Sequence, residues 1–174
     1  MKIVILNGSP RKGGNTQIMV DAFENTAKEN HTIVKLNIAP MEIRGCLGCQ
    51  YCWSHKGECV QKDDMSKVWE QLKDADMVVF ASPIYWFDIT AQLKTVIDRM
   101  YTGGGTGFHF NKTALLLDAG ADNVFTAAIT QYREMTAYLK WENKGIVCVP
   151  NMKEKGSMAN APQLDEVIKL AESL

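Results

Sequence analysis

Short apolar runs with the composition of buried β-strands alternate with segments of helical spacing along almost the whole chain. Residues 77–81 are all apolar, as expected of a parallel strand that is covered on both faces. The pattern predicts strands at residues 2–7, 31–38, 77–81, 113–117 and 146–149. It predicts helices at residues 15–29, 63–72, 90–100, 124–143 and 164–174.

Five strands joined by helices imply right-handed crossovers and a parallel sheet with helices on both faces. Five strands fit the order 2-1-3-4-5 better than the six-stranded dinucleotide-binding order. The predicted class is therefore α/β, a flavodoxin-like three-layer sandwich. A length of 174 residues, with no repeat or linker, predicts one domain over residues 1–174.

Charge and hydropathy exclude several partners. The net charge is −1 and the 19 Lys and Arg residues form no basic stripe, so we expect no nucleic-acid partner. The apolar run at the N-terminus is too short for a signal peptide, and no run approaches membrane length. We therefore expect a cytoplasmic protein that binds no membrane and whose thiols stay reduced.

The loop after the first strand has the composition of a phosphate-binding loop. A helix N-terminus offers free N–H groups and partial positive charge to an anion. Both G-x-G-x-x-G and the Walker pattern are absent, which favours a monophosphate. The alternative is an ordinary strand-to-helix turn. The candidate phosphate ligands are Ser9, Arg11, Gly14, Asn15 and Thr16.

Three consecutive aromatic residues follow the third strand. Pro83 lacks an N–H, and we expect the chain to leave the sheet there. An exposed shelf of Tyr85 and Trp86 would stack against a planar ring, with Ile84 beside it. Asp88 is the expected cap of the next helix. The alternative is an aromatic subunit interface.

At this point the chain resembles a known family. The segments SPRKGGNT, SPIYW and AQLKTVIDR, in this order, resemble the NAD(P)H-dependent FMN reductases over residues 2–149. The resemblance implies FMN, with its phosphate on the loop from Ser9 to Thr16 and its isoalloxazine against Pro83, Ile84, Tyr85 and Trp86. A third contact would lie near Asp118 and Gly120. NAD(P)H would be the electron donor, and a homodimer or higher homo-oligomer the assembly.

Four of the five cysteines lie close together, as Cys46-x2-Cys49-x2-Cys52 and then Cys59. Ferredoxins use similarly tight spacing for iron–sulfur ligands, but their runs end in x3-Cys-Pro, whereas here six residues precede Cys59 and Val60 follows it. Zinc ranks second. The segment resembles the cluster motif of the iron–sulfur flavoproteins, which implies a [4Fe–4S] cluster near the flavin. The alternative is a set of dimer contacts or redox-sensitive thiols. Cys148, within an apolar strand, is an expected core thiol.

The leading hypothesis is an enzyme that passes electrons from NAD(P)H through FMN to a small-molecule or protein acceptor. No catalytic acid or base is assigned, because the flavin supplies the redox chemistry. One alternative is an iron–sulfur electron carrier between protein partners. Another is a redox-sensing module that uses the thiols.

Overall fold

The computed structural model describes all residues from 1 to 174. The strands are β1 (Lys2–Asn7), β2 (Thr32–Asn37), β3 (Met77–Tyr85), β4 (Asp88–Ile89), β5 (Lys112–Asp118) and β6 (Glu142–Val149). The α-helices are α1 (Asn15–Ala27), α2 (Tyr51–Ser54), α3 (Met65–Leu72), α4 (Ala91–Arg99), α5 (Thr126–Leu139) and α6 (Leu164–Glu172). Two short 3-10 helices are η1 (Met100–Gly104) and η2 (Ser157–Asn160).

Five strands form a parallel sheet in the order β2-β1-β3-β5-β6. Counted without the two-residue β4, this is the order 2-1-3-4-5, and the predicted α/β class is confirmed. The sixth strand, β4, was not predicted; it pairs antiparallel with the end of β3 in a tight hairpin.

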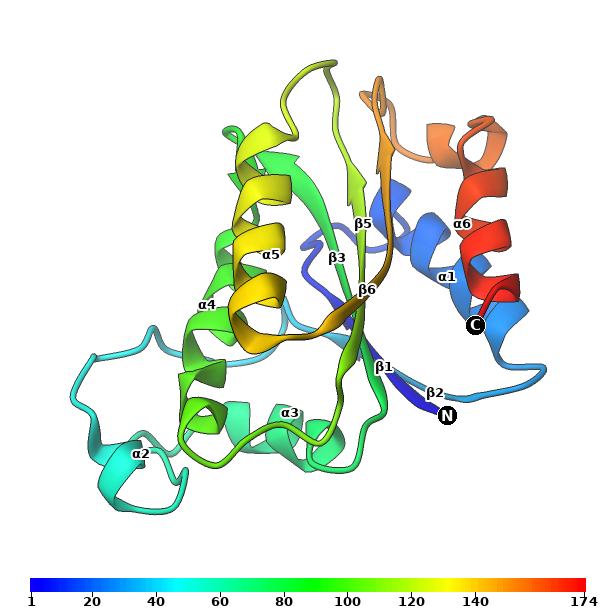
Figure 1. Cartoon of the computed structure of the whole chain (residues 1–174). Helices are drawn as coiled ribbons and strands as arrows, with labels where there is room; N and C mark the ends of the chain where they lie inside the picture. The colour runs from blue at the N-terminus through cyan, green and yellow to red at the C-terminus, as the bar shows by residue number, and fades with distance from the viewer.

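Helices cover both faces of the sheet (Figure 1). Helices α1 and α6 lie together on one face, whereas α3, α4 and α5 lie on the other. Each face has its own core, because the strands are apolar on both sides. The α1 side includes Met19, Phe23 and Val167, and the α4 side includes Leu93, Val96 and Tyr132. None of the helices combines the length and the apolar character needed to cross a membrane.

The carboxyl ends of β1, β3 and β5 meet at one edge of the sheet. Asn7 at the end of β1 is level with Ala81 in β3, and Pro83 is level with Asp118 at the end of β5. The Gly8 N–H donates to the Ala81 carbonyl at 2.8 Å. The loops that follow these three strands are therefore neighbours, as the topology requires at its switch point.

The prediction that the chain leaves the sheet at Pro83 is confirmed only in part, because pairing with β5 ends at Pro83 but the next two residues still pair with β4. Strand β3 continues through Pro83 to Tyr85. Pairing with β1 stops at Ala81, so β3 has a sheet neighbour on only one side beyond that point. A residue without an N–H is tolerated at such an edge. Asp88 consequently belongs to β4, and Thr90 caps α4, with its Oγ1 accepting from the Leu93 N–H at 3.4 Å.

Helix α5 ends four residues earlier than predicted, at Leu139. Lys140 has a positive φ of 56°, and the Trp141 N–H donates to the Thr136 carbonyl at 2.9 Å. This is a left-handed helix end formed without the usual glycine, which explains why no stop signal is visible in the sequence. Strand β6 therefore begins at Glu142 instead of Ile146.

Candidate functional site

A cavity of about 160 Å³ lies where the loops after β1, β3 and β5 converge. Eight of the eleven predicted cofactor-binding residues line it: Ser9, Arg11, Asn15, Thr16, Pro83, Tyr85, Asp118 and Gly120. Ala119, Met152 and Lys153 complete the lining. The sequence signal missed Met152 and Lys153, because they reach the cavity from the loop after β6.

The loop after β1 presents backbone donors toward this cavity. Gly13 has a φ of 62°, a left-handed conformation that suits glycine, and the turn closes with the Gly14 N–H donating to the Arg11 carbonyl at 3.1 Å. Gly14 is the N-cap of α1, and no side chain caps the helix. The first turn of α1 thus keeps N–H groups free for an anion, as a phosphate site requires.

Asn15 has a structural role that the sequence did not reveal. Its side-chain amide donates to the carbonyls of Met152 at 3.0 Å and Glu154 at 2.9 Å. Its carbonyl oxygen accepts from the N–H groups of Gly156 at 2.9 Å and Met158 at 3.2 Å. All its hydrogen-bonding capacity is used on the loop after β6, so this side chain positions the cavity wall.

Thr16 and Asp118 form a buried pair at the cavity. The Thr16 hydroxyl donates to Asp118 Oδ1 at 2.5 Å, and Asp118 is only 5% exposed. Burial raises the pKa of the Asp118 carboxyl to about 6, while the Thr16 hydrogen bond and the charge of Arg11 lower it by less. The cavity thus contains one carboxyl group that titrates near neutral pH.

Of the three consecutive aromatic residues, Tyr85 at the end of β3 is the one that lines the cavity. Trp86, in contrast, is 92% exposed. The rings of Trp86 and Phe87 meet edge to face, with their centroids 5.9 Å apart. Trp86 and Phe87 form the tip of the β3–β4 hairpin with positive φ values of 50° and 72°. Ile84 pairs with Ile89 and packs on the core. Bulky residues in this conformation are strained, which marks the tip as a functional candidate.

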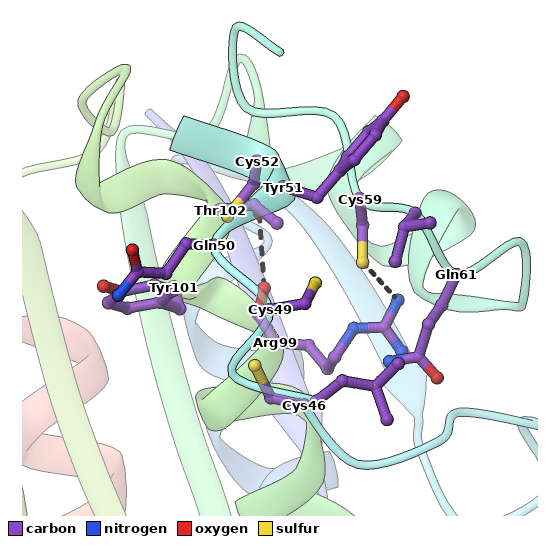
Figure 2. Close-up of a pocket in the computed structure, with 12 residues that line it drawn as sticks. Cys46, Cys49, Gln50, Tyr51, Cys52, Cys59, Gln61, Arg99, Tyr101 and Thr102 are labelled. Carbon is purple, nitrogen blue, oxygen red and sulfur yellow. Dashed lines mark hydrogen bonds between the residues drawn. The ribbon is translucent and has the colours of Figure 1, made fainter. Parts of the chain in front are cut away.

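All four clustered cysteines line a second, smaller pocket in the loop between β2 and α3 (Figure 2). Cys46 and Cys49 are exposed, and Cys52 and Cys59 are half-buried. This pocket shares no residue with the cavity at the sheet edge. The two sites lie at opposite ends of α4, a nine-residue helix that spans about 13 Å.

The cysteine pocket has the donor chemistry of an iron–sulfur site but not the geometry of a single-metal site. No three His, Cys, Asp or Glu side chains converge closely enough in this structure to hold a metal ion. In a [4Fe–4S] cluster each cysteine binds a different iron, so the sulfurs surround a core instead of one point. The hollow is about 20 Å³, and a cluster would require the irregular, exposed segment around Cys46 and Cys49 to open.

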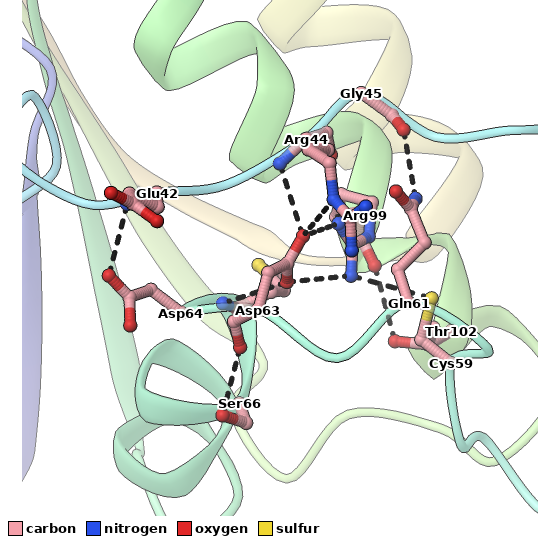
Figure 3. A network of polar contacts seen from close by, with 11 residues as sticks. Glu42, Arg44, Gly45, Cys59, Gln61, Asp63, Asp64, Ser66, Arg99 and Thr102 are labelled. Atoms are coloured by element: carbon pink, nitrogen blue, oxygen red, sulfur yellow. Dashed lines mark hydrogen bonds and ion pairs between the residues drawn. The ribbon is translucent and has the colours of Figure 1, made fainter.

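Arg99 is a residue of this region that sequence reasoning missed. It is 1% exposed at the end of α4 and forms a bidentate ion pair with Asp63, at 2.7 and 3.1 Å (Figure 3). Burial raises the pKa of the Asp63 carboxyl, but donors from Arg99, Arg44 and Met65 outweigh burial and hold the pKa below its ordinary value. A sequence signal existed, because Arg99 lies on the same helical stripe as Leu93 and Val96.

Cys148 lies apart from both sites, on β6. Burial raises the pKa of its thiol to about 11, so it stays protonated at neutral pH. Cys148 is half-buried and packs against the core, so the expectation of a core thiol is met only in part.

Solved structures share the fold over the whole chain. The NAD(P)H:quinone oxidoreductase from Methanothermobacter marburgensis superposes with a TM-score of 0.75 at 20% identity, covering 99% of this chain and 96% of that one. An azoreductase from Bacillus anthracis superposes with a TM-score of 0.77 at 20% identity and covers both chains completely. These likenesses confirm the flavodoxin-like fold.

Curated relatives are similar in sequence. An iron-sulfur flavoprotein of Archaeoglobus fulgidus is 37% identical over 154 residues, which are 86% of this chain and 66% of that protein. A second from the same organism is 30% identical over 139 residues, which are 79% of this chain and 71% of that protein. One from Methanosarcina thermophila is 36% identical over 100 residues, which are 57% of this chain and 52% of that protein. The chain spans about half to two thirds of the length of the first such relatives.

The model of one protein family matches most of the sequence. It is the NADPH-dependent FMN reductase family, and the match covers residues 1–147, which include the loops after β1, β3 and β5. The second Archaeoglobus fulgidus relative is matched over more than two thirds of its own length. The chain therefore belongs to the NADPH-dependent FMN reductase family.

Proposed function

We propose that the chain binds FMN in the cavity at the ends of β1, β3 and β5 and acts as an NAD(P)H oxidoreductase. Electrons would pass from the nicotinamide to a small-molecule or protein acceptor. The observation that carries the proposal is the convergence of eight predicted cofactor residues, from three separate segments of the chain, on one cavity. Family membership supports the same cofactor and donor.

The phosphate would bind at the loop after β1. The uncapped N-terminus of α1 supplies N–H donors and partial positive charge. Arg11 lines the same cavity and would add a charge-assisted hydrogen bond to the phosphate, and Ser9 would add a hydroxyl donor. Gly14 allows close approach of the backbone because it has no side chain.

Thr16 and Asp118 suit the ribityl chain of FMN better than its phosphate. An ionised carboxylate only accepts hydrogen bonds, so Asp118 would repel a phosphate but accept from a hydroxyl. The Thr16 hydroxyl already donates to Asp118 at 2.5 Å, which fixes the carboxylate at the cavity wall. Gly120 leaves room beside them, because the nearest atom to an added Cβ is 3.5 Å away.

The ring would lie against the end of β3. Pro83 and Tyr85 line the cavity and would contact the ring, and backbone groups from Ile84 to Trp86 would bond its polar edge. When bound, FMN accepts a hydride from the nicotinamide and releases electrons to the acceptor. The exposed Trp86 would contact the nicotinamide or the acceptor outside the cavity.

An Arg11→Ala variant tests the phosphate site. Loss of one charged hydrogen bond of about 1.5 to 3 kcal/mol weakens FMN binding about ten- to hundredfold. The matched control is Lys12→Ala, because Lys12 is an exposed neighbouring cation that does not line the cavity. Equal FMN dissociation constants for the two variants and the wild type would remove Arg11 from the site.

Anaerobic stopped-flow reduction tests the activity itself. NADH or NADPH should bleach the flavin absorption of the FMN-loaded chain rapidly. If neither donor reduces the bound flavin, the oxidoreductase proposal fails.

The cysteine pocket supports a second candidate function, an iron–sulfur electron carrier between protein partners. All four cysteines line one pocket, and three similar proteins are named iron-sulfur flavoproteins. Cys46, Cys49, Cys52 and Cys59 would bind a [4Fe–4S] cluster, which exchanges single electrons. Anaerobic purification followed by iron and sulfide assay tests this function. If the protein contains no iron and NAD(P)H still reduces its flavin, the carrier function is refuted and the oxidoreductase function remains.

The proposal includes a homodimer in a reducing compartment such as the cytoplasm. Trp86 and Tyr138 are 92% and 87% exposed, and interfaces favour such aromatic residues. Sedimentation equilibrium of the wild type against Trp86→Ser tests the assembly, with a monomeric wild type as the contrary result.

A further inference from the structure

The buried Arg99 side chain joins the two ends of the cysteine loop. One terminal nitrogen, Nη1, donates to the Arg44 carbonyl at 2.8 Å and to Asp63 Oδ2 at 2.7 Å. The other, Nη2, donates to Asp63 Oδ1 at 3.1 Å and to Cys59 Sγ at 3.4 Å (Figures 2 and 3). Arg44 precedes the first cysteine and Asp63 follows the last, so one guanidinium fixes both ends and contacts a sulfur.

The ion pair beside this contact is buried and carries no net charge. Asp63 balances the charge of Arg99, and a second guanidinium, that of Arg44, lies 3.9 Å from the same carboxylate. The Asp63 and Arg99 side chains are 6% and 1% exposed, so water screens their charges weakly. The sulfur of Cys59 therefore meets a donor from a buried, neutral ion pair, whereas the additional positive charge of Arg44 is on a side chain that is 68% exposed.

Arg99 also carries an unused donor. Its Nε is buried and has no hydrogen-bond partner, although Arg99 is one of the residues that line the cysteine pocket. Leaving a buried donor unsatisfied costs about 1 to 3 kcal/mol. An anionic, sulfur-rich occupant of the pocket would provide acceptors to such a group.

We propose that Arg99 is a positioning residue for a cluster bound by the four cysteines, and that its hydrogen bond to Cys59 raises the cluster's reduction potential. Reduction adds one negative charge to the cluster, and a donor to a ligand sulfur stabilises that charge. The inference rests on the cluster proposed above, and it is independent of FMN.

Helix α4 separates this site from the FMN cavity. At its start, the buried Thr90 hydroxyl donates to the Gly8 carbonyl at 2.8 Å, beside the loop after β1. At its end lies Arg99. FMN affinity therefore serves as an internal check that a change at Arg99 has left the rest of the fold intact.

The test measures the cluster's midpoint potential in the anaerobically purified full chain, by redox titration followed with electron paramagnetic resonance. Arg99→Met combined with Asp63→Asn removes the donor to Cys59 together with its counter-charge, so the net charge is unchanged and no buried carboxylate is left unpaired. Arg99→Lys keeps the positive charge but replaces the planar guanidinium, which has several N–H donors, by a single ammonium group. Lys94→Met is the control, because Lys94 is a half-exposed residue of α4 that pairs with Asp98 at 2.5 Å.

The expected result is a lower potential in the double variant, with the one-electron equilibrium shifted at least about tenfold, or 59 mV. Arg99→Lys should shift less, and the control not at all, with FMN affinity unchanged in all three. Unchanged potentials in both Arg99 variants would overturn the inference. A wild type that binds FMN but contains no iron would also overturn it, and would leave the oxidoreductase proposal standing.

Discussion

Replacing Asp118 by Asn should stabilise the FMN-free protein at neutral pH. Asp118 is 5% exposed, and burial raises its pKa to about 6. In the unfolded chain the same carboxyl has an ordinary pKa of about 3.9. Between these two values the folded state binds the proton and the unfolded state does not, so stability falls as the pH rises through this window.

The magnitude follows from the size of the shift. A rise of about two pKa units at about 1.4 kcal/mol each costs the folded state roughly 3 kcal/mol above pH 6. At about pH 4.5 most of the folded protein carries the proton, and the cost is only about 1 kcal/mol. Asn has nearly the same shape, its oxygen still accepts from Thr16, and it does not titrate. The stability gap between variant and wild type should thus widen by about 2 kcal/mol from about pH 4.5 to about pH 8.

Urea unfolding of both FMN-free proteins at the two pH values measures this gap. All other titrating groups are common to the two proteins and cancel in the comparison. Asp122→Asn is the control, since Asp122 is an exposed carboxylate of the same loop and bonds only Asn151. A gap that is equal at the two pH values would refute the reasoning.

Two further predictions concern the loops around the cavity. Gly8→Ala places a Cβ 2.6 Å from Leu93 Cβ, so it should destabilise the chain by about 1 to 3 kcal/mol and weaken FMN binding, as urea unfolding and FMN titration would show. Gly120→Ala, whose added Cβ is 3.5 Å from its nearest neighbour, should change stability by less than about 0.5 kcal/mol; similar losses in the two variants would contradict this. Replacing Trp86 and Phe87 by Asn and Gly, residues that accept positive φ, should raise unfolding free energy by about 1 to 2 kcal/mol and slow electron transfer to the acceptor. A less stable variant in urea unfolding would show that the hairpin tip is not strained.

The sequence predicted the sheet order because the apolar runs and the crossover rule act locally and independently of side-chain detail. It also predicted which loops meet, since the ends of parallel strands β1, β3 and β5 share one edge. The end of α5 was missed because Lys140 adopts a positive φ without the glycine that usually signals it. The extension of β3 through Pro83 was missed because it depends on where pairing with β1 ends, and strand pairing is set by the tertiary structure.

Individual roles at the site were harder to predict than its location. Asn15 has the composition of a phosphate ligand, yet its amide bonds Met152 and Glu154, more than 130 residues away in sequence. Trp86 is adjacent to Tyr85 but faces solvent, because the hairpin turn at residues 86–87 points it away from the cavity. The role of Arg99 was not predicted, because the folding of a long loop brings its partners Asp63 and Cys59 to it.

Calorimetric titration of the FMN-free chain with FMN and with riboflavin tests the central claim most directly. The two ligands share the ring and the ribityl chain and differ only in the phosphate. If the amides at the start of α1 and Arg11 bind that phosphate, FMN should bind at least about a hundredfold more tightly than riboflavin. Equal affinity for the two ligands, or no binding of either, would contradict the account.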